Sequence, residues 1–203
     1  MERREFLGGA LSALLFPRLL SAEGAEAVDK PRLARITFYH PRVQPENDPR
    51  QRRITIRLLC GERRQVWVSR RCALNGTLRL SEKNGGHLIT AHSKFYWLEL
   101  DAEKFPFGQG CRGDAIVPFK TVAADPRVFP YGSRVFVPMF EMLGMPDGSV
   151  HDGHFTVLDV GGKVKGDHLD LAVRDDSDYR ILVNKIPWKS VKGGHGLWVQ
   201  RVG

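Results

Sequence analysis

The stretch VLDVGGKVKGDHLD, residues 157–170, joins two strand-like runs through a glycine-rich turn. Asp159 ends the first run, where apolar neighbours favour the protonated form of its carboxyl group. The Gly161-Gly162 pair follows closely, and glycine lets the backbone turn sharply and lets a bulky ligand approach it. The pattern therefore places an acid that holds its proton beside a turn that a large substrate can reach.

The second run alternates in polarity over residues 168–172. A period of two sends Leu169 and Leu171 to one face of a strand and sends His168 and Asp170 to the other. The polar face can point back at the turn, which would give a pair of carboxylates suited to acid–base chemistry. An Asx turn and a solvated strand face are the structural alternatives for these acids, and the residues alone leave both open.

This stretch resembles the signature of the 3D domain, which is named for three aspartates. The 3D domain is the C-terminal domain of the membrane-bound lytic transglycosylase A family. Residues 119–133, FKTVAADPRVFPYGS, resemble the first block of that domain and supply the third aspartate, Asp125. Residues 143–155 resemble its hairpin, so the likeness runs in order over residues 116–173. Two shorter runs are similar to its opening and closing strands, residues 35–39 and 197–200.

The resemblance implies an all-β fold, a double-psi β-barrel over residues 34–203, with residues 43–112 partly forming a β-rich insertion. Strand-like runs separated by glycine and proline clusters also favour a barrel. At most one short helix is expected, at residues 177–184, where acids near its start suit the helix dipole. The expected strands are residues 34–39, 54–59, 65–68, 77–80, 87–91, 95–100, 121–124, 134–138, 155–160, 168–173 and 197–202.

By the same resemblance the protein is an enzyme, a peptidoglycan lytic transglycosylase. Such enzymes cleave the β-1,4 bond between N-acetylmuramic acid and N-acetylglucosamine, and the C6 hydroxyl of the sugar attacks in place of water to give a 1,6-anhydro product. One carboxyl group can then protonate the leaving oxygen and accept the proton of the attacking hydroxyl. Asp159 is the candidate for that role, with Asp170 as an orienting partner and Asp125 as a third acid that shapes the site or holds sugar hydroxyls.

The candidate substrate-binding residues in the same motif are Gly161, Gly162, Lys165 and His168. His168 is expected to donate a hydrogen bond to Asp170. Lys163 departs from the family, which usually has alanine there, and if it pointed inward it would lower the pKa of Asp159. Proton chemistry of this kind needs neither a metal nor a cofactor, so none is expected.

Two other functions fit the same residues. A glycoside hydrolase on this barrel would use two aspartates and a water molecule, and its products would carry a reducing end. A non-catalytic cell-wall-binding module would use the aspartates only for structure. The products released from peptidoglycan distinguish these possibilities.

The first 27 residues are typical of an export signal, with a twin-arginine-like start, an apolar run and a small-residue end. Residues 28–33 would form a tether. The apolar run is too short and too interrupted to span a bilayer, so we expect a protein of the periplasm or cell envelope without stable membrane insertion.

Because the signal holds three arginines and four glutamates, its removal changes the formal net charge from +8 to +9. This charge favours anionic partners, and we expect peptidoglycan strands rather than nucleic acid, whose clustered basic and aromatic readers are not found.

Three cysteines allow one disulfide, and Cys60 and Cys72, which flank an expected hairpin, are the first candidate pair. Cys111 would then remain a thiol. Aromatic side chains in the insertion offer either stacking faces for sugar rings or packing for a core. They are Trp67, Tyr96, Trp97, Phe105 and Phe107.

Overall fold

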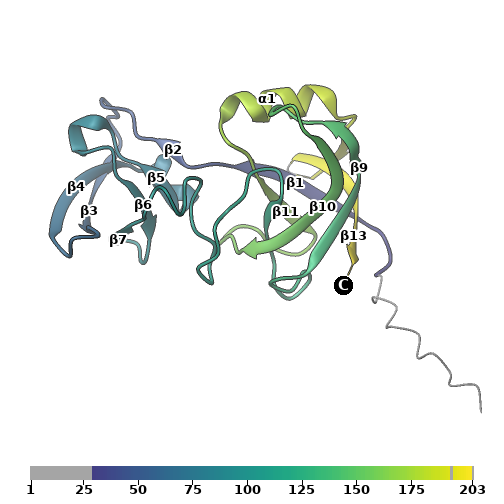
Figure 1. Cartoon of the computed structure of the whole chain (residues 1–203), viewed down its shortest axis with the longest axis horizontal. Helices are drawn as coiled ribbons and strands as arrows, with labels where there is room; N and C mark the ends of the chain where they lie inside the picture. The colour runs from purple at the N-terminus through teal and green to yellow at the C-terminus, as the bar shows by residue number, and fades with distance from the viewer. Residues whose placement is uncertain (1–28, 193, 203) are drawn as a thin grey trace, which may run out of the picture.

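The computed structural model describes residues 29–192 and 194–202, whose strands form two sheets. Figure 1 shows the sheets as two lobes side by side, with residues 42–99 building the blue to teal lobe on the left. The export signal expected at residues 1–27 lies outside the described residues.

The larger sheet closes into a six-stranded barrel, which confirms the all-β double-psi fold. Its strands are β1 (Arg32–Tyr39), β8 (Thr121–Ala124), β9 (Arg134–Gly144), β10 (Val150–Asp159), β11 (His168–Ala172) and β13 (Gly194–Val202). They follow the order β1-β11-β8-β10-β9-β13, and the pairing of β13 with β1 closes the ring. β12 (Lys189–Val191) extends this sheet beside β13.

Alternate residues of the barrel strands fill its interior, as the period of a strand requires. Val122 and Ala124 of β8 point into the core together with Leu169 and Leu171 of β11. The residues between them point to the outside of the barrel. The alternation predicted for residues 168–172 is therefore confirmed.

The second sheet lies between β1 and β8 in the chain and has the order β2-β5-β6-β7-β3-β4. Its strands are β2 (Arg42–Val43), β3 (Gln51–Arg57), β4 (Arg63–Ser69), β5 (Thr77–Arg79), β6 (Leu88–Ala91) and β7 (Tyr96–Glu99). Two short 3-10 helices accompany them, η1 (Cys72–Asn75) and η2 (Glu82–Asn84). One face of this sheet packs its own core around Ile56, Leu78 and Trp97, so Trp97 is a core residue rather than a sugar-stacking face.

Helix α1 (Asp176–Lys185) lies across one end of the barrel (Figure 1), and it confirms the helix expected at residues 177–184. Asp175 caps it, because its side chain accepts hydrogen bonds from the backbone N–H groups of Ser177 and Asp178. Leu182 anchors the helix in the barrel core. Across residues 29–192 and 194–202, no helix combines the length and the apolar character needed to cross a membrane.

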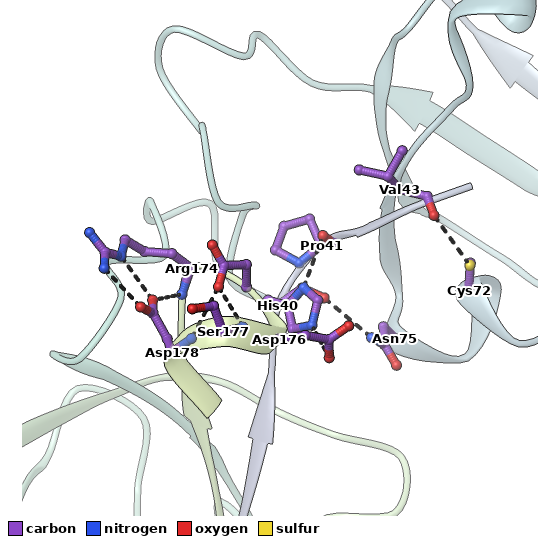
Figure 2. A network of polar contacts seen from close by, with 10 residues as sticks. His40, Pro41, Val43, Cys72, Asn75, Arg174, Asp176, Ser177 and Asp178 are labelled. Atoms are coloured by element: carbon purple, nitrogen blue, oxygen red, sulfur yellow. Dashed lines mark hydrogen bonds and ion pairs between the residues drawn. The ribbon is translucent and has the colours of Figure 1, made fainter. Parts of the chain in front are cut away.

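A polar network joins the two lobes where the chain leaves β1 (Figure 2). Nε2 of His40 lies 3.2 Å from Oδ1 of Asp176, at the start of α1. The His40 carbonyl accepts a hydrogen bond of 3.2 Å from the side chain of Asn75, at the end of η1. Helix α1 of the barrel lobe and η1 of the other lobe are thus fixed to the same residue.

Two expectations from the sequence are wrong in detail. β1 begins at Arg32, so the last two residues of the expected tether belong to a strand, because β13 pairs with them. The pairing of Cys60 with Cys72 is also wrong, because all three cysteines of the described chain are free thiols. Cys60 lies in the turn before β4 and Cys72 lies beyond its other end, and seven residues of strand separate such points by about 23 Å.

Candidate active site

A cavity of about 860 Å³ lies between the barrel and the second sheet. Five of the seven predicted site residues line it: Asp159, Asp170, Gly161, Gly162 and His168. The second sheet contributes Thr77, Thr90 and Leu98, and His92 follows β6 on the same side. Asp125 and Lys165 are not among the lining residues. None of the five aromatic side chains considered as sugar-stacking faces lines this cavity.

Asp159 and Asp170 share a row across the barrel, because both pair with Ala123 of β8. Between β10 and β8 the register shifts, so that Val157 pairs with Val122 and Asp159 pairs with the next residue, Ala123. Leu158 is thus an extra residue, a β-bulge. If β10 paired regularly with β8, Leu158 would stand opposite Ala123 and Asp159 opposite Ala124, whose side chain points into the barrel core. The bulge therefore turns Asp159 to the side of the cavity.

Residues 110 and 111 close over the end of β10. A Cβ atom on Gly110 would overlap the carbonyl oxygen of Leu158, so only glycine allows this approach. The neighbouring Cys111 lines the cavity beside Asp159. The pKa of the Asp159 carboxyl is raised to about 6, mainly by burial and to a smaller degree by the charge of Asp170, while hydrogen bonds from the backbone N–H groups of Val160 and Cys111 oppose the rise.

Asp170 is held by Thr37 of β1, which stands opposite it in the parallel register. The Thr37 hydroxyl donates a hydrogen bond of 2.6 Å to Oδ1 of Asp170, and Nε2 of His168 lies 2.8 Å from the same hydroxyl oxygen. The direct bond expected from His168 to Asp170 is therefore wrong, because Thr37 stands between them. Burial raises the pKa of Asp170, while the Thr37 hydrogen bond and the charge of Arg35 oppose the rise.

Asp125 holds the turn that carries the glycine pair. Its buried carboxylate accepts hydrogen bonds from the Arg127 side chain, at 2.8 and 3.1 Å, and from the N–H of Gly166 at 3.0 Å. These partners hold the pKa of Asp125 well below its usual range. Asp125 thus lies outside the cavity, where its carboxylate holds the turn, which is compatible with the expectation that this acid shapes the site.

The turn residues differ in what they contact. A Cβ atom on Gly161 would overlap the Val164 side chain, whereas one on Gly162 would meet nothing within 4 Å. Lys163 lines the cavity, yet the pKa of Asp159 is raised rather than lowered. Lys165 is exposed outside the cavity. Within the described ranges, no three His, Cys, Asp or Glu side chains gather as a metal site would require.

The 3D domain family matches residues 120–178, which contain Asp125, Asp159 and Asp170. This chain carries a 3D domain. The matched residues include four of the six barrel strands and the start of helix α1, so the 3D domain supplies both carboxylates of the cavity. A comparison of the sequence with curated proteins gives no match.

Comparison with solved structures finds similar chains among lytic transglycosylases. E. coli MltA with bound chitohexaose is 13% identical, with a TM-score of 0.53 over 84% of this chain and 72% of that chain. A second E. coli MltA structure, described as a unique lytic transglycosylase fold, is 15% identical over 83% and 71%, with a TM-score of 0.44. The lytic transglycosylase LtgG of Burkholderia pseudomallei is 15% identical over 85% and 72%, with a TM-score of 0.40. Only the first TM-score exceeds 0.5, and at that identity it shows a shared fold.

Strand β1 brings to the 3D domain site residues that were not expected. Thr37 and Tyr39 line the cavity, although residues 35–39 were expected only as an opening strand. Burial raises the pKa of Tyr39, and the charges of Asp159 and Asp170 raise it further, so its hydroxyl keeps its proton beside the two acids. A sequence signal for both residues exists, because polar and apolar positions alternate from Ala34 to Tyr39.

Proposed function

We propose that this protein is a lytic transglycosylase that cleaves the glycan strands of peptidoglycan. The observation that carries the proposal is Asp159, a carboxyl group with a pKa raised to about 6 in a cavity large enough for several sugar rings. At pH 7 about one tenth of such a group is protonated, so it is available as a general acid near neutral pH.

In the proposed reaction Asp159 gives its proton to the glycosidic oxygen while the bond from that oxygen to C1 of N-acetylmuramic acid breaks. The leaving N-acetylglucosamine keeps the proton on its 4-hydroxyl. The Asp159 carboxylate then accepts the proton of the C6 hydroxyl as that oxygen bonds to C1. No water is consumed, a 1,6-anhydro ring forms, and Asp159 returns to its starting state.

The other residues act around this proton transfer. The Asp170 carboxylate, held by Thr37, stabilises the positive charge that develops at C1. His168 orients Asp170 through the shared Thr37 hydroxyl. Gly161 and Gly162 let the strand approach the backbone. Lys165 lies outside the cavity and has no role in this reaction.

The same proposal includes the compartment. Peptidoglycan lies in the cell envelope, and the export signal expected at residues 1–27 would bring the protein there. The chitohexaose of the E. coli MltA structure supports a substrate built from N-acetylhexosamine units. We further propose that residues 43–112 are an insertion that adds the second wall of the cavity.

The test compares three proteins on purified peptidoglycan, with the soluble products analysed by mass spectrometry. Wild type is expected to release fragments with anhydro ends, and Asp159→Asn is expected to lose at least about 100-fold of this activity. Asp167→Asn is the matched control, because Asp167 is an exposed acid of the same turn that pairs with Arg32. Its activity should equal that of wild type.

Other products would point to the other functions. Fragments that are heavier by one water and carry reducing ends would identify a hydrolase. Retention on peptidoglycan without soluble fragments, unchanged by Asp159→Asn, would identify a binding module.

A further inference from the structure

We propose that the outer face of the second sheet binds the carboxylate-bearing part of the same glycan strand, as an arginine surface made of Arg53, Arg57 and Arg63. This inference rests on the proposed function and adds to it a binding surface outside the reacting cavity. It assigns the second sheet a role in holding an anionic polymer.

Strand register makes this face continuous with the wall of the cavity. Thr77 of β5 pairs with Thr90 of β6, and Thr90 pairs with Leu98 of β7, and all three residues line the cavity. Leu98 pairs in turn with Arg57 of β3, and Arg57 pairs with Arg63 of β4. Paired residues lie on one face of a sheet, so a single face runs from the cavity to the two arginines.

The face leads away from the barrel. β3 and β4 lie at the far end of their lobe, and β5 and β6 lie nearer the barrel (Figure 1). Arg53 precedes Arg57 by four residues on the same face of β3, and it pairs with Trp67, whose side chain is 56% exposed. A polymer that fills the cavity and continues outward over this lobe would therefore pass the arginines.

Aromatic rings connect the cavity with the arginines. The ring of His92, which lines the cavity, lies 5.8 Å from the ring of Tyr96 in an edge-to-face arrangement. Arg63 is the first residue of β4, and its guanidinium group lies 5.8 Å from the centre of the same Tyr96 ring. Tyr96 thus separates a cavity residue from an arginine of the surface.

The charge of this face is uncompensated. In the strands β3, β4 and β7, the residues on this face are arginine, threonine, serine, glutamine, leucine or aromatic, and the acid Glu99 faces the other side. Among the residues that the structure describes, no carboxylate lies within 4.0 Å of the side-chain nitrogens of Arg53, Arg57 or Arg63. Three exposed guanidinium groups without acidic partners suit a ligand that brings carboxylates.

Peptidoglycan strands carry such carboxylates, on lactyl groups and peptide stems, whereas chitohexaose is uncharged. The arginine surface is therefore expected to strengthen the binding of peptidoglycan strands and to leave the binding of chitohexaose unchanged. Exposed ion pairs contribute about two- to threefold each in affinity, so three of them amount to roughly tenfold.

The test measures binding of the full chain to insoluble peptidoglycan and to chitohexaose. The triple variant Arg53→Gln, Arg57→Gln and Arg63→Gln is compared with a control of equal charge change, Arg134→Gln, Arg180→Gln and Lys192→Gln, at exposed barrel-lobe positions. The first variant is expected to bind peptidoglycan roughly tenfold more weakly, to lose most of its salt dependence and to bind chitohexaose like wild type. The control should match wild type on both ligands.

Three outcomes would overturn the inference: equal peptidoglycan binding by the two triple variants, weakened chitohexaose binding by the surface variant, or tighter binding of a DNA duplex than of peptidoglycan by wild type. The proposed function is judged separately, by anhydro products. Wild type that forms anhydro products while both variants bind equally would keep the function and reject the surface. Wild type that forms none, with binding that depends on the arginines, would keep the surface and reject the function.

Discussion

Thr37 and Asp170 are 133 positions apart in the chain, yet they face each other across the parallel strands β1 and β11 and share a hydrogen bond of 2.6 Å. The same hydroxyl oxygen lies 2.8 Å from Nε2 of His168. Because the hydroxyl proton goes to Asp170, His168 donates to the oxygen of Thr37. One threonine therefore satisfies two titratable groups.

Replacement of Thr37 by valine removes this hydroxyl at nearly constant volume. We expect the free energy of unfolding, measured in urea, to fall by about 1 to 3 kcal/mol, because His168 and Asp170 both lose a hydrogen-bond partner. Anhydro-product release should fall about 10- to 100-fold. Thr37→Ser should restore most of both losses, and a valine variant as stable and as active as wild type would contradict the assignment.

The rate of the proposed reaction should depend on pH through both acids of the cavity. Asp159 must be protonated, so the rate should fall above about pH 6, by tenfold for each further unit. Asp170 must be ionised, and because its pKa is raised, the acid limb should lie above the usual aspartate range of about 4. Initial rates between pH 4 and pH 8 test this bell shape, and a rate that stays level from pH 6 to pH 8 would exclude Asp159 as the acid.

Asp159→Asn should stabilise the fold at alkaline pH. The folded state holds the Asp159 proton more tightly than the unfolded state, so wild-type stability decreases as pH rises from about 4 to 6 and stays low above that range. The variant avoids this cost, which amounts to about 1 to 3 kcal/mol, or several degrees in Tm. Thermal unfolding at pH 8 should show the gain and at pH 4 should show almost none. Asp167→Asn, as the control, should gain nothing at either pH.

Cys111 reports the charge of Asp159 without any substrate. Burial raises the pKa of the Cys111 thiol, and the Asp159 carboxylate raises it further. Because the thiolate is the form that reacts, iodoacetamide should modify Cys111 about two- to threefold faster in Asp159→Asn at pH 8. Cys60, exposed in the other lobe, serves as the internal standard. Peptide mass spectrometry gives both rates, and an unchanged ratio would place Asp159 too far from the thiol.

Local pattern was sufficient to predict most of the barrel. The alternation of residues 168–172 and the acids near the start of α1 each indicated the element that forms. The strand expected at residues 134–138 in fact continues to Gly144, although Pro138 lies within it. The pairing of β9 with β13 stops at Phe136. Pro138 lies beyond it, where β13 offers no carbonyl that an N–H at this position would have to bind, so the strand tolerates the proline.

The site depended more on pairings that a single sequence does not reveal. Asp159 and Asp170 were expected near one turn, but the row through Ala123 follows from the register of three strands. Thr37 was missed because its partner strand is remote in the chain. For Asp125 the sequence left two roles open, shaping the site or holding sugar hydroxyls, because its position after β8 is compatible with either direction of its side chain. Arg127 and Gly166 hold it away from the cavity.

The bulge at Leu158 makes the position of the acid depend on how many residues β10 contains. Insertion of one residue beside that leucine would preserve all three aspartates and the glycine turn, but with the same one-residue bulge it would move Asp159 to the row of Ala124, against the apolar interior. A gene that gained one codon there would still encode the full motif while its product could not place the acid. Counting residues between Val157 and Asp159 is therefore a better criterion for a copy that can place this acid than the presence of the aspartates.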